Sequence, residues 1–505
     1  MKFEPTKCCG KKTTVPMLKP LVGALVLATG LWAAPASAVK TEINGVYNVW
    51  GISQNSFFFG KKKESFGSDN DNYVVQMLRL KVSLADDNDD IKAITRFDLA
   101  QGWWGVDNAG NKSIDGGQFY DKGTFFDVHV DHAYLDFRVP NTESRVMVGR
   151  FHHALGNKLV LDDDLDGIKF IAPMGNSKLS LAFAKPFEGD VDLTGQGTTP
   201  VGDQSLNALN DEGSTNDANM FSIAFDHKMG GNNLSAWYVY YGDEGYDDGS
   251  AYITQGLGYA RPRFTPQVTE LNILGGAATF KMGSITLNGE FNYLSGEDDI
   301  ANATFNGNKN DKNNGDLEGY TAYLDAKMGF GDGGKSNVGM KFGIGSGDDD
   351  PTSGEGNITK LKTQGFFYFT EIWEDSIMPD VAGITPQGLG APNTKGYREF
   401  ENTTALQLYA NFAINKSMSI FGSYSYMMAT EDVHGWDANG PTSHLSDDIG
   451  QEFDAIFKWK LYKKLIFSSR FGYFMPGDAT LLLVNGNTIN DDDAWEWKNT
   501  LTFKF

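Results

Sequence analysis

Short segments in which apolar and polar residues alternate recur along most of the chain. In residues 91–100, for example, Phe97 and Leu99 alternate with Arg96 and Asp98. A period of two places successive side chains on opposite faces of a β-strand. We count about 18 such segments, each long enough for a tilted strand to cross a bilayer. The sequence therefore predicts an all-β protein.

The connections between these segments alternate in length. The short connections are 85–90, 140–144, 173–177, 230–233 and 462–463, and the long ones include 53–72, 103–127, 188–217, 243–268 and 346–402. A soluble sandwich also alternates along its strands, but long and short connections in turn place loops at one rim and turns at the other. We therefore predict an antiparallel up-and-down transmembrane β-barrel of about 18 strands, with 16 as the alternative count. We expect the longest loop, Ser346–Asn402, to fold over or into the mouth of the barrel.

The apolar content of the chain is spread out and not concentrated in long runs. After residue 38 no apolar run approaches the 18 residues of a spanning helix, so a closed barrel is the remaining way to cross a membrane. The mean hydropathy of −0.35 agrees with this, because only every second strand residue of a barrel faces lipid.

The N-terminal residues have the pattern of a secretory signal peptide. Five lysines and one glutamate precede or flank an apolar run, Leu21–Ala34, which is followed by Ala36-Ser37-Ala38. We predict a cleaved signal peptide at residues 1–38 and a barrel at residues 39–505. Both cysteines, Cys8 and Cys9, lie in the predicted signal peptide, which excludes disulfides, thiol catalysis and covalently attached haem from the mature chain.

The charge balance is strongly acidic. The formal net charge is −22, and it becomes −26 when the five lysines and one glutamate of the predicted signal peptide are removed. A surface of this sign disfavours nucleic acid as a partner, since phosphate binding needs a basic surface. Acidic loops are expected to favour the entry of cations.

The last strand alternates up to the final residue. Its apolar parity consists of Trp495, Trp497, Leu501, Phe503 and Phe505. This ending resembles the C-terminal strand of Gram-negative outer-membrane barrels, where a terminal Phe is the assembly signal. The resemblance implies the outer membrane as location, lipid and lipopolysaccharide as surroundings, and the barrel assembly machinery as a partner through Phe505.

A second resemblance concerns the segment Val148–Ile171. It is similar to porin families, which have a G-R strand, a short loop and an L-D-G-[IV] strand start. The matching residues are Gly149, Arg150, Leu165, Asp166, Gly167 and Ile168. Because porins often form trimers, the resemblance implies a homotrimer.

Charged residues share the predicted lumenal parity of the second to sixth strands. The candidate pore-lining residues are Arg79, Lys81, Lys92, Arg96, Asp98, Asp136, Arg138, Arg150 and Lys169. They resemble the basic wall of general porins and could hold small anions such as organic acids. The alternative is that these charges pair across strands and only solvate the interior, which still lines the water path.

One acidic motif suggests a divalent cation. Asp162, Asp164, Asp166 and Gly167 match the first half of an EF-hand loop, but Pro173 stands where the bidentate Glu is needed. We reject the EF-hand and keep a looser divalent-ion site at these carboxylates as a hypothesis. No other metal and no cofactor is predicted.

The predicted function is a porin, a water-filled channel for passive diffusion of ions and small hydrophilic solutes. Two alternatives stay open. One is a barrel that sheathes a partner such as a multihaem cytochrome in an electron conduit. The other is a barrel hydrolase that uses His132 or His153, although no nucleophile motif accompanies these histidines. We expect that the protein is not an enzyme.

Overall fold

The computed structural model describes residues 39–61, 67–104, 129–187, 218–243, 270–298, 315–331, 334–347, 349, 356–361, 369–374, 400–437 and 440–505. The predicted signal peptide and large parts of the predicted long loops lie outside these residues.

The described residues form nineteen strands and one helix. The first ten strands are β1 (Lys40–Asn55), β2 (Asn70–Ala85), β3 (Ile91–Trp103), β4 (His129–Arg138), β5 (Arg145–Ala154), β6 (Asp162–Met174), β7 (Ser177–Phe187), β8 (Ala218–Met229), β9 (Asn232–Asp243) and β10 (Glu270–Met282). The remaining elements are β11 (Ile285–Asp298), β12 (Gly315–Phe330), β13 (Ser336–Gly345), β14 (Gly356–Asn357), β15 (Thr403–Ala413), β16 (Met418–Asp437), β17 (Gly440–Tyr462), β18 (Leu465–Pro476), α4 (Asp478–Asn485) and β19 (Ala494–Lys504).

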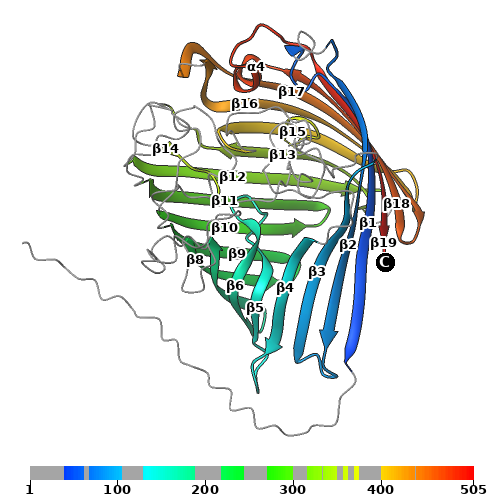
Figure 1. Ribbon diagram of the computed structural model, residues 1–505, viewed down its shortest axis with the longest axis vertical. Helices are drawn as coiled ribbons and strands as arrows, with labels where there is room; N and C mark the ends of the chain where they lie inside the picture. The colour runs from blue at the N-terminus through cyan, green and yellow to red at the C-terminus, as the bar shows by residue number, and fades with distance from the viewer. Residues whose placement is uncertain are drawn as a thin grey trace, which may run out of the picture. The chain divides into compact units, whose positions relative to one another are not determined.

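The strands form one closed antiparallel ring (Figure 1). Neighbours in sequence are neighbours in the sheet, and β1 pairs with both β2 and β19. The two-residue β14 lies outside the ring, because β13 pairs directly with β15 while β14 pairs in parallel with β12. Without β14 the ring has 18 strands, which confirms the predicted all-β barrel and its strand count.

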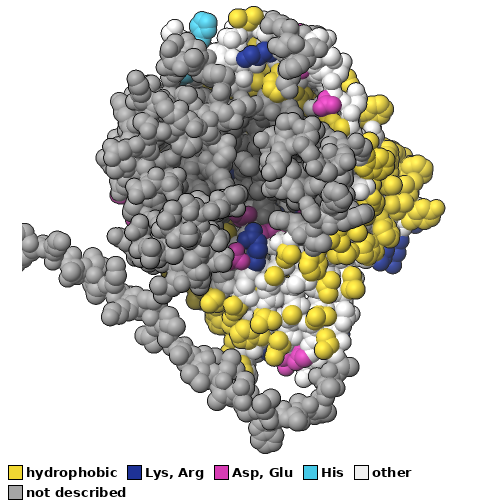
Figure 2. All heavy atoms as spheres, in the orientation of Figure 1, with side chains coloured by type: hydrophobic (Ala, Val, Ile, Leu, Met, Phe, Trp, Pro, Cys, Tyr) yellow, Lys and Arg dark blue, Asp and Glu magenta, His cyan; other side chains and the backbone are white. Residues whose placement is uncertain are grey.

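The two faces of the ring differ in chemistry. Large apolar side chains are exposed on one face of nearly every strand, among them Leu135, Ile168, Phe221, Leu274 and Phe291. Figure 2 shows such side chains as yellow surfaces on the outside of the wall. The other face carries charged and polar side chains together with buried apolar ones. This division is the one that a barrel in a lipid bilayer requires.

No helix among the described residues is long and apolar enough to span a membrane.

The ring closes where the two ends of the barrel meet. The Phe505 amide donates to the Gly45 carbonyl at 3.0 Å, and the Gly45 amide donates to the Phe505 carbonyl at the same distance. A side chain at Gly45 would collide with the Phe505 ring, which stacks on Phe503 with ring centroids 5.4 Å apart. The absence of a Cβ at Gly45 therefore makes room for the terminal aromatic ring.

We expect Gly45→Val to weaken this closure. Displacing the Phe505 ring should cost about 1–3 kcal/mol, the usual effect of overpacking a tight contact. The midpoint of urea unfolding, measured on protein refolded into lipid vesicles, should fall accordingly. Gly51→Val is the matched control, because Gly51 is also on β1 and its added Cβ would meet no atom within 4 Å. Equal midpoints for the two variants would contradict the assigned role of Gly45.

Segments between the strands pack against the inner face of the ring. One apolar cluster joins Phe57 and Phe59, the segment 369–374 and helix α4 to β15–β18. A second cluster joins Leu155, Val160 and Leu161 with Ile358 and Leu361 against β8–β12. The described parts of the Ser346–Asn402 loop thus lie against the inner wall, in agreement with the expected infolding of this loop.

Candidate functional site

The hairpin between β5 and β6 leaves the wall of the barrel at its tip. Pairing of β4 with β5 ends at Ala133 and Arg150, and pairing of β6 with β7 ends at Asp166 and Lys185. The pairing of β5 with β6 continues beyond these points, as far as Ala154 opposite Asp162. Residues 151–165 are therefore paired only with each other, and we name them the constriction hairpin.

Two glycines lie where the constriction hairpin departs. Gly149 has φ +121°, and a Cβ there would collide with the Ala133 carbonyl oxygen. Gly167, directly opposite, leaves no room for a Cβ beside the Phe183 carbonyl oxygen. Both glycines belong to the segment Val148–Ile171, which resembles porin families. The close backbone contacts explain why glycine stands at these two positions.

The tip of the constriction hairpin reaches β11, five strands further along the ring. The Asn157 amide donates to Glu290, and Asn288 donates to Asn157 Oδ1 at 3.0 Å. The Leu361 amide donates to the Val160 carbonyl at 2.9 Å, so the tip also meets the inserted part of the 346–402 loop. These contacts hold the hairpin inside the lumen, where it narrows the path.

At the base of this hairpin, arginines and carboxylates form a continuous ion-pair network, which we name the arginine ladder. Arg79 binds Asp98 with two hydrogen bonds of 2.6 and 2.5 Å and Asp131 with one of 2.8 Å. Arg96 donates to Asp131 at 2.9 Å and to Asp164 at 2.7 Å. The carboxylates are nearly buried, with side-chain exposures between 2% and 8%. Such pairs are far less screened than surface ion pairs.

Lys81 and Lys92 have a different environment on the same inner face. Lys81 is exposed to the lumen opposite Arg96 and has no ion pair within the described ranges. Lys92 lies 3.6 Å from Asp89 in the turn that follows β2. Lys81 is therefore an exposed cation of this wall, and Lys92 is only loosely paired.

The other predicted lumenal residues of this wall are paired near the turn rim or beneath the hairpin. Asp136 accepts from Arg145 at 2.7 Å, and Arg138 lies 3.3 Å from Asp90. Lys169 donates to His153.

Arg150 does not face the lumen, and this prediction is wrong. It pairs with Ala133 on β4 and with Asp166 on β6, on the face that carries the exposed Val148 and Ile168. Arg150 Nη1 lies 3.0 Å from Asp166 Oδ2 on that outer face. Met147 is the residue of β5 that faces inward, beside Lys169, and Arg150 lies three positions further along the strand on the opposite parity.

Asp131 and His132 belong to the site and could not be found from strict alternation. A register shift opposite Arg96 and Phe97 inserts Asp131 into β4, so both Asp131 and His132 are buried among inner-wall residues. A β-bulge of this kind changes the parity of a strand.

A second polar contact holds the segment 369–374 against β17. Glu452 is fully buried and accepts hydrogen bonds from the Ile372 amide at 2.6 Å and the Trp373 amide at 2.9 Å. Arg470 on β18 binds Glu371 of the same segment at 2.8 Å. We name this contact the β17 clamp.

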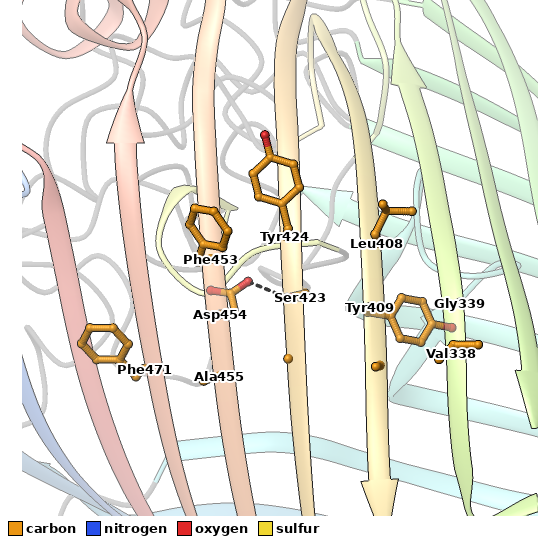
Figure 3. Close-up of a pocket in the computed structure, with 12 residues that line it drawn as sticks. Val338, Gly339, Leu408, Tyr409, Ser423, Tyr424, Phe453, Asp454, Ala455 and Phe471 are labelled. Atoms are coloured by element: carbon orange, nitrogen blue, oxygen red, sulfur yellow. Dashed lines mark hydrogen bonds between the residues drawn. The ribbon is translucent and has the colours of Figure 1, made fainter. Parts of the chain in front are cut away.

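An open pocket lies along the wall beside the β17 clamp (Figure 3). Asp454 and Ser423, joined by a hydrogen bond of 3.1 Å, are inner-face residues, whereas Leu408 and Phe453 are exposed on the outer face. The pocket therefore follows the wall itself and does not form an enclosed solute site.

We expect Glu452→Ala to release the segment 369–374. Its two amides would lose their acceptors, at a cost of about 1–3 kcal/mol for each buried group left unsatisfied. Limited proteolysis should then cleave this segment in the folded barrel faster than in the wild type. Glu452→Gln keeps one carbonyl acceptor and serves as the control, with an intermediate cleavage rate. Unchanged cleavage of the alanine variant would contradict the clamp.

Comparisons with known proteins give structural matches only. No protein-family model matches the sequence, and no curated protein matches it. The chain is similar to solved Pseudomonas aeruginosa structures of the outer membrane protein OpdK, of OccK8 (OprE) and of OccK2 (OpdF) in complex with glucuronate. The identities are 10%, 10% and 11%, each match covers 92% of this chain and 98% of the other, and each TM-score is 0.49.

Proposed function

We propose that the protein is an outer-membrane porin, a water-filled channel for passive diffusion of ions and small hydrophilic solutes. The observation that carries this proposal is the closed ring of 18 strands with an apolar outer face and an ionised inner face. A sheet of this kind satisfies all its backbone hydrogen bonds inside lipid and leaves polar side chains for a water path.

The proposed selectivity follows from two opposing features. The acidic chain draws cations to the entrance, while Lys81 and the loosely paired Lys92 offer positive charges with access to the lumen. The arginines of the ladder are already neutralised by carboxylates, so they position the constriction hairpin more than they attract anions. We infer small solutes as cargo, because the hairpin and the described segments 356–361 and 369–374 pack against the inner wall.

The geometry at His153 argues against the hydrolase alternative. His153 Nε2 lies 3.0 Å from Ser222 Oγ, which at first resembles a catalytic pair. Lys169 Nζ, however, lies 3.0 Å from His153 Nδ1, and a charged lysine can only donate. The Nδ1 atom then accepts and Nε2 carries the proton, so His153 cannot take a proton from Ser222.

The electron-conduit alternative meets a steric objection. A partner sheathed by the barrel needs an open lumen, whereas residues 151–165, 356–361 and 369–374 pack against its inner wall. We therefore retain free diffusion as the proposed function.

Further parts of the proposal concern biogenesis and assembly. We propose export through the signal peptide at residues 1–38, recognition of the strand ending at Phe505 by the barrel assembly machinery, insertion among lipid and lipopolysaccharide, and assembly as a homotrimer.

Planar-bilayer recordings test the proposed function. The purified protein should insert, conduct in steps, and give a reversal potential of cation-selective sign in a salt gradient. Co-purification of a haem protein would instead favour the conduit. Stable insertion without ion current would overturn the proposal of an open pore.

A further inference from the structure

Two histidines and a carboxylate converge at the base of the constriction hairpin. His132 Nε2 lies 2.9 Å from Asp164 Oδ1, and His152 Nδ1 lies 3.1 Å from the same oxygen. All three donor atoms lie within 4.8 Å of one another. From this geometry we propose that His132, His152 and Asp164 bind a divalent transition-metal ion of the zinc type inside the lumen.

The donor set suits this class of ion. Zinc binds imidazole nitrogen and carboxylate oxygen at about 2.0–2.2 Å, so its ligand atoms lie a little over 3 Å apart. Calcium and magnesium prefer all-oxygen sites, which the two histidines do not provide. Three protein ligands leave a fourth position for water, and the His152 side chain is 36% exposed.

The residues around these three ligands orient them. Asp164 uses Oδ1 toward the histidines, while its Oδ2 is held by Arg96 at 2.7 Å. Asp162 Oδ1 lies 3.0 Å from His152 Nε2, and its Oδ2 is held by Lys158 at 2.9 Å. With His152 Nδ1 on the metal, Nε2 keeps its proton and faces Asp162. This is the carboxylate–histidine–metal arrangement that fixes the ring of a metal-bound histidine.

Asp162 lies against the second nitrogen of the His152 ring. Its side chain is 4% exposed, and its Oδ1 atom lies 3.0 Å from His152 Nε2. Metal binding would fix the His152 ring with Nε2–H directed at this oxygen.

The site joins the wall to the hairpin. His132 comes from β4, whereas His152 and Asp164 come from the constriction hairpin beyond the point where it leaves β4. A bound ion would therefore fix the hairpin to the wall. Of the carboxylates singled out in the sequence, Asp164 belongs to this site, Asp162 orients His152, and Asp166 lies on the outer face with Arg150.

Titration of the purified, detergent-folded protein with zinc chloride tests the site, and it does not depend on channel activity. We expect one zinc ion per chain, with affinity at least about tenfold weaker in His132→Gln and in His152→Gln, and an intermediate loss in Asp162→Asn. His227→Gln is the matched control, because its Nδ1 lies 2.8 Å from Ser177 Oγ, on β8 and away from the hairpin.

Heat-modifiable gel mobility shows whether each variant is folded, and only folded variants are compared. Absence of stoichiometric zinc binding by the wild type would overturn the proposal, and the cluster would then be an ion-pair network only. Equal affinity of the wild type and a folded His132→Gln,His152→Gln double variant would also overturn it, since the zinc would then be bound elsewhere.

Discussion

Replacing Leu155–Leu161 by Asn-Gly is expected to raise the single-channel conductance severalfold. Ala154 and Asp162 are directly opposite each other in the β5–β6 ladder, so a two-residue turn can join them without changing the register. The shortened hairpin would lose its contacts with Glu290 and with the 346–402 loop, and the lumen would widen. Step conductance in planar bilayers under symmetric salt measures the effect.

Lys158→Ala separates the steric effect of this change from its charge effect. Lys158 is the one charged residue of the replaced segment, and its substitution leaves the length of the hairpin unchanged. We expect its conductance to remain close to that of the wild type. If the shortened variant also conducted like the wild type, the constriction hairpin would not limit the path.

The second large effect, a loss of stability, is expected when Arg96 is replaced. Arg96→Met leaves Asp131 and Asp164 without this partner while both remain nearly buried. Removing one member of a buried ion pair typically costs about 3–5 kcal/mol, because a buried charge is left uncompensated. The urea midpoint of the vesicle-refolded protein should fall strongly.

Lys81→Met is the matched control for Arg96→Met. Lys81 lies directly opposite Arg96 on the same inner face. Its replacement by Met removes the same formal charge as Arg96→Met. Because Lys81 is exposed and has no ion pair in the described ranges, its loss should change stability by less than about 1 kcal/mol. Both variants should shift the reversal potential toward cations. Equal losses of stability would show that the buried pairs of Arg96 contribute nothing specific.

Local alternation and the lengths of the connections together were sufficient to predict the barrel. Each strand has apolar residues on its lipid-facing side and mostly polar residues on the other. Connections such as 140–144 and 173–177 are too short to join anything other than antiparallel neighbours. Strand ends were less predictable. β17 begins at Gly440, ten residues before its pairing with β18 starts at Gly450, because its first residues pair with the long β16 alone.

The site was only partly predictable, because it depends on departures from alternation. The parity rule identified Arg79, Arg96 and Asp98, which lie in regular parts of β2 and β3. It missed the role of Asp131, since a bulge brings this residue to the inner face. It also could not show that Asp164 turns inward while Asp166, two residues later, stays outside, because that requires the hairpin to leave the sheet.

The way the constriction hairpin is attached has a consequence for how such a pore can diversify. Residues 151–165 of the hairpin pair in the sheet only with each other, and not with β4 or β7. New residues at the tip therefore leave the pairing of the surrounding wall intact. Lipid-facing strands and the tip can therefore evolve as separate modules. Substitutions in the constriction hairpin can therefore change the inside of the barrel while its lipid-facing exterior stays the same.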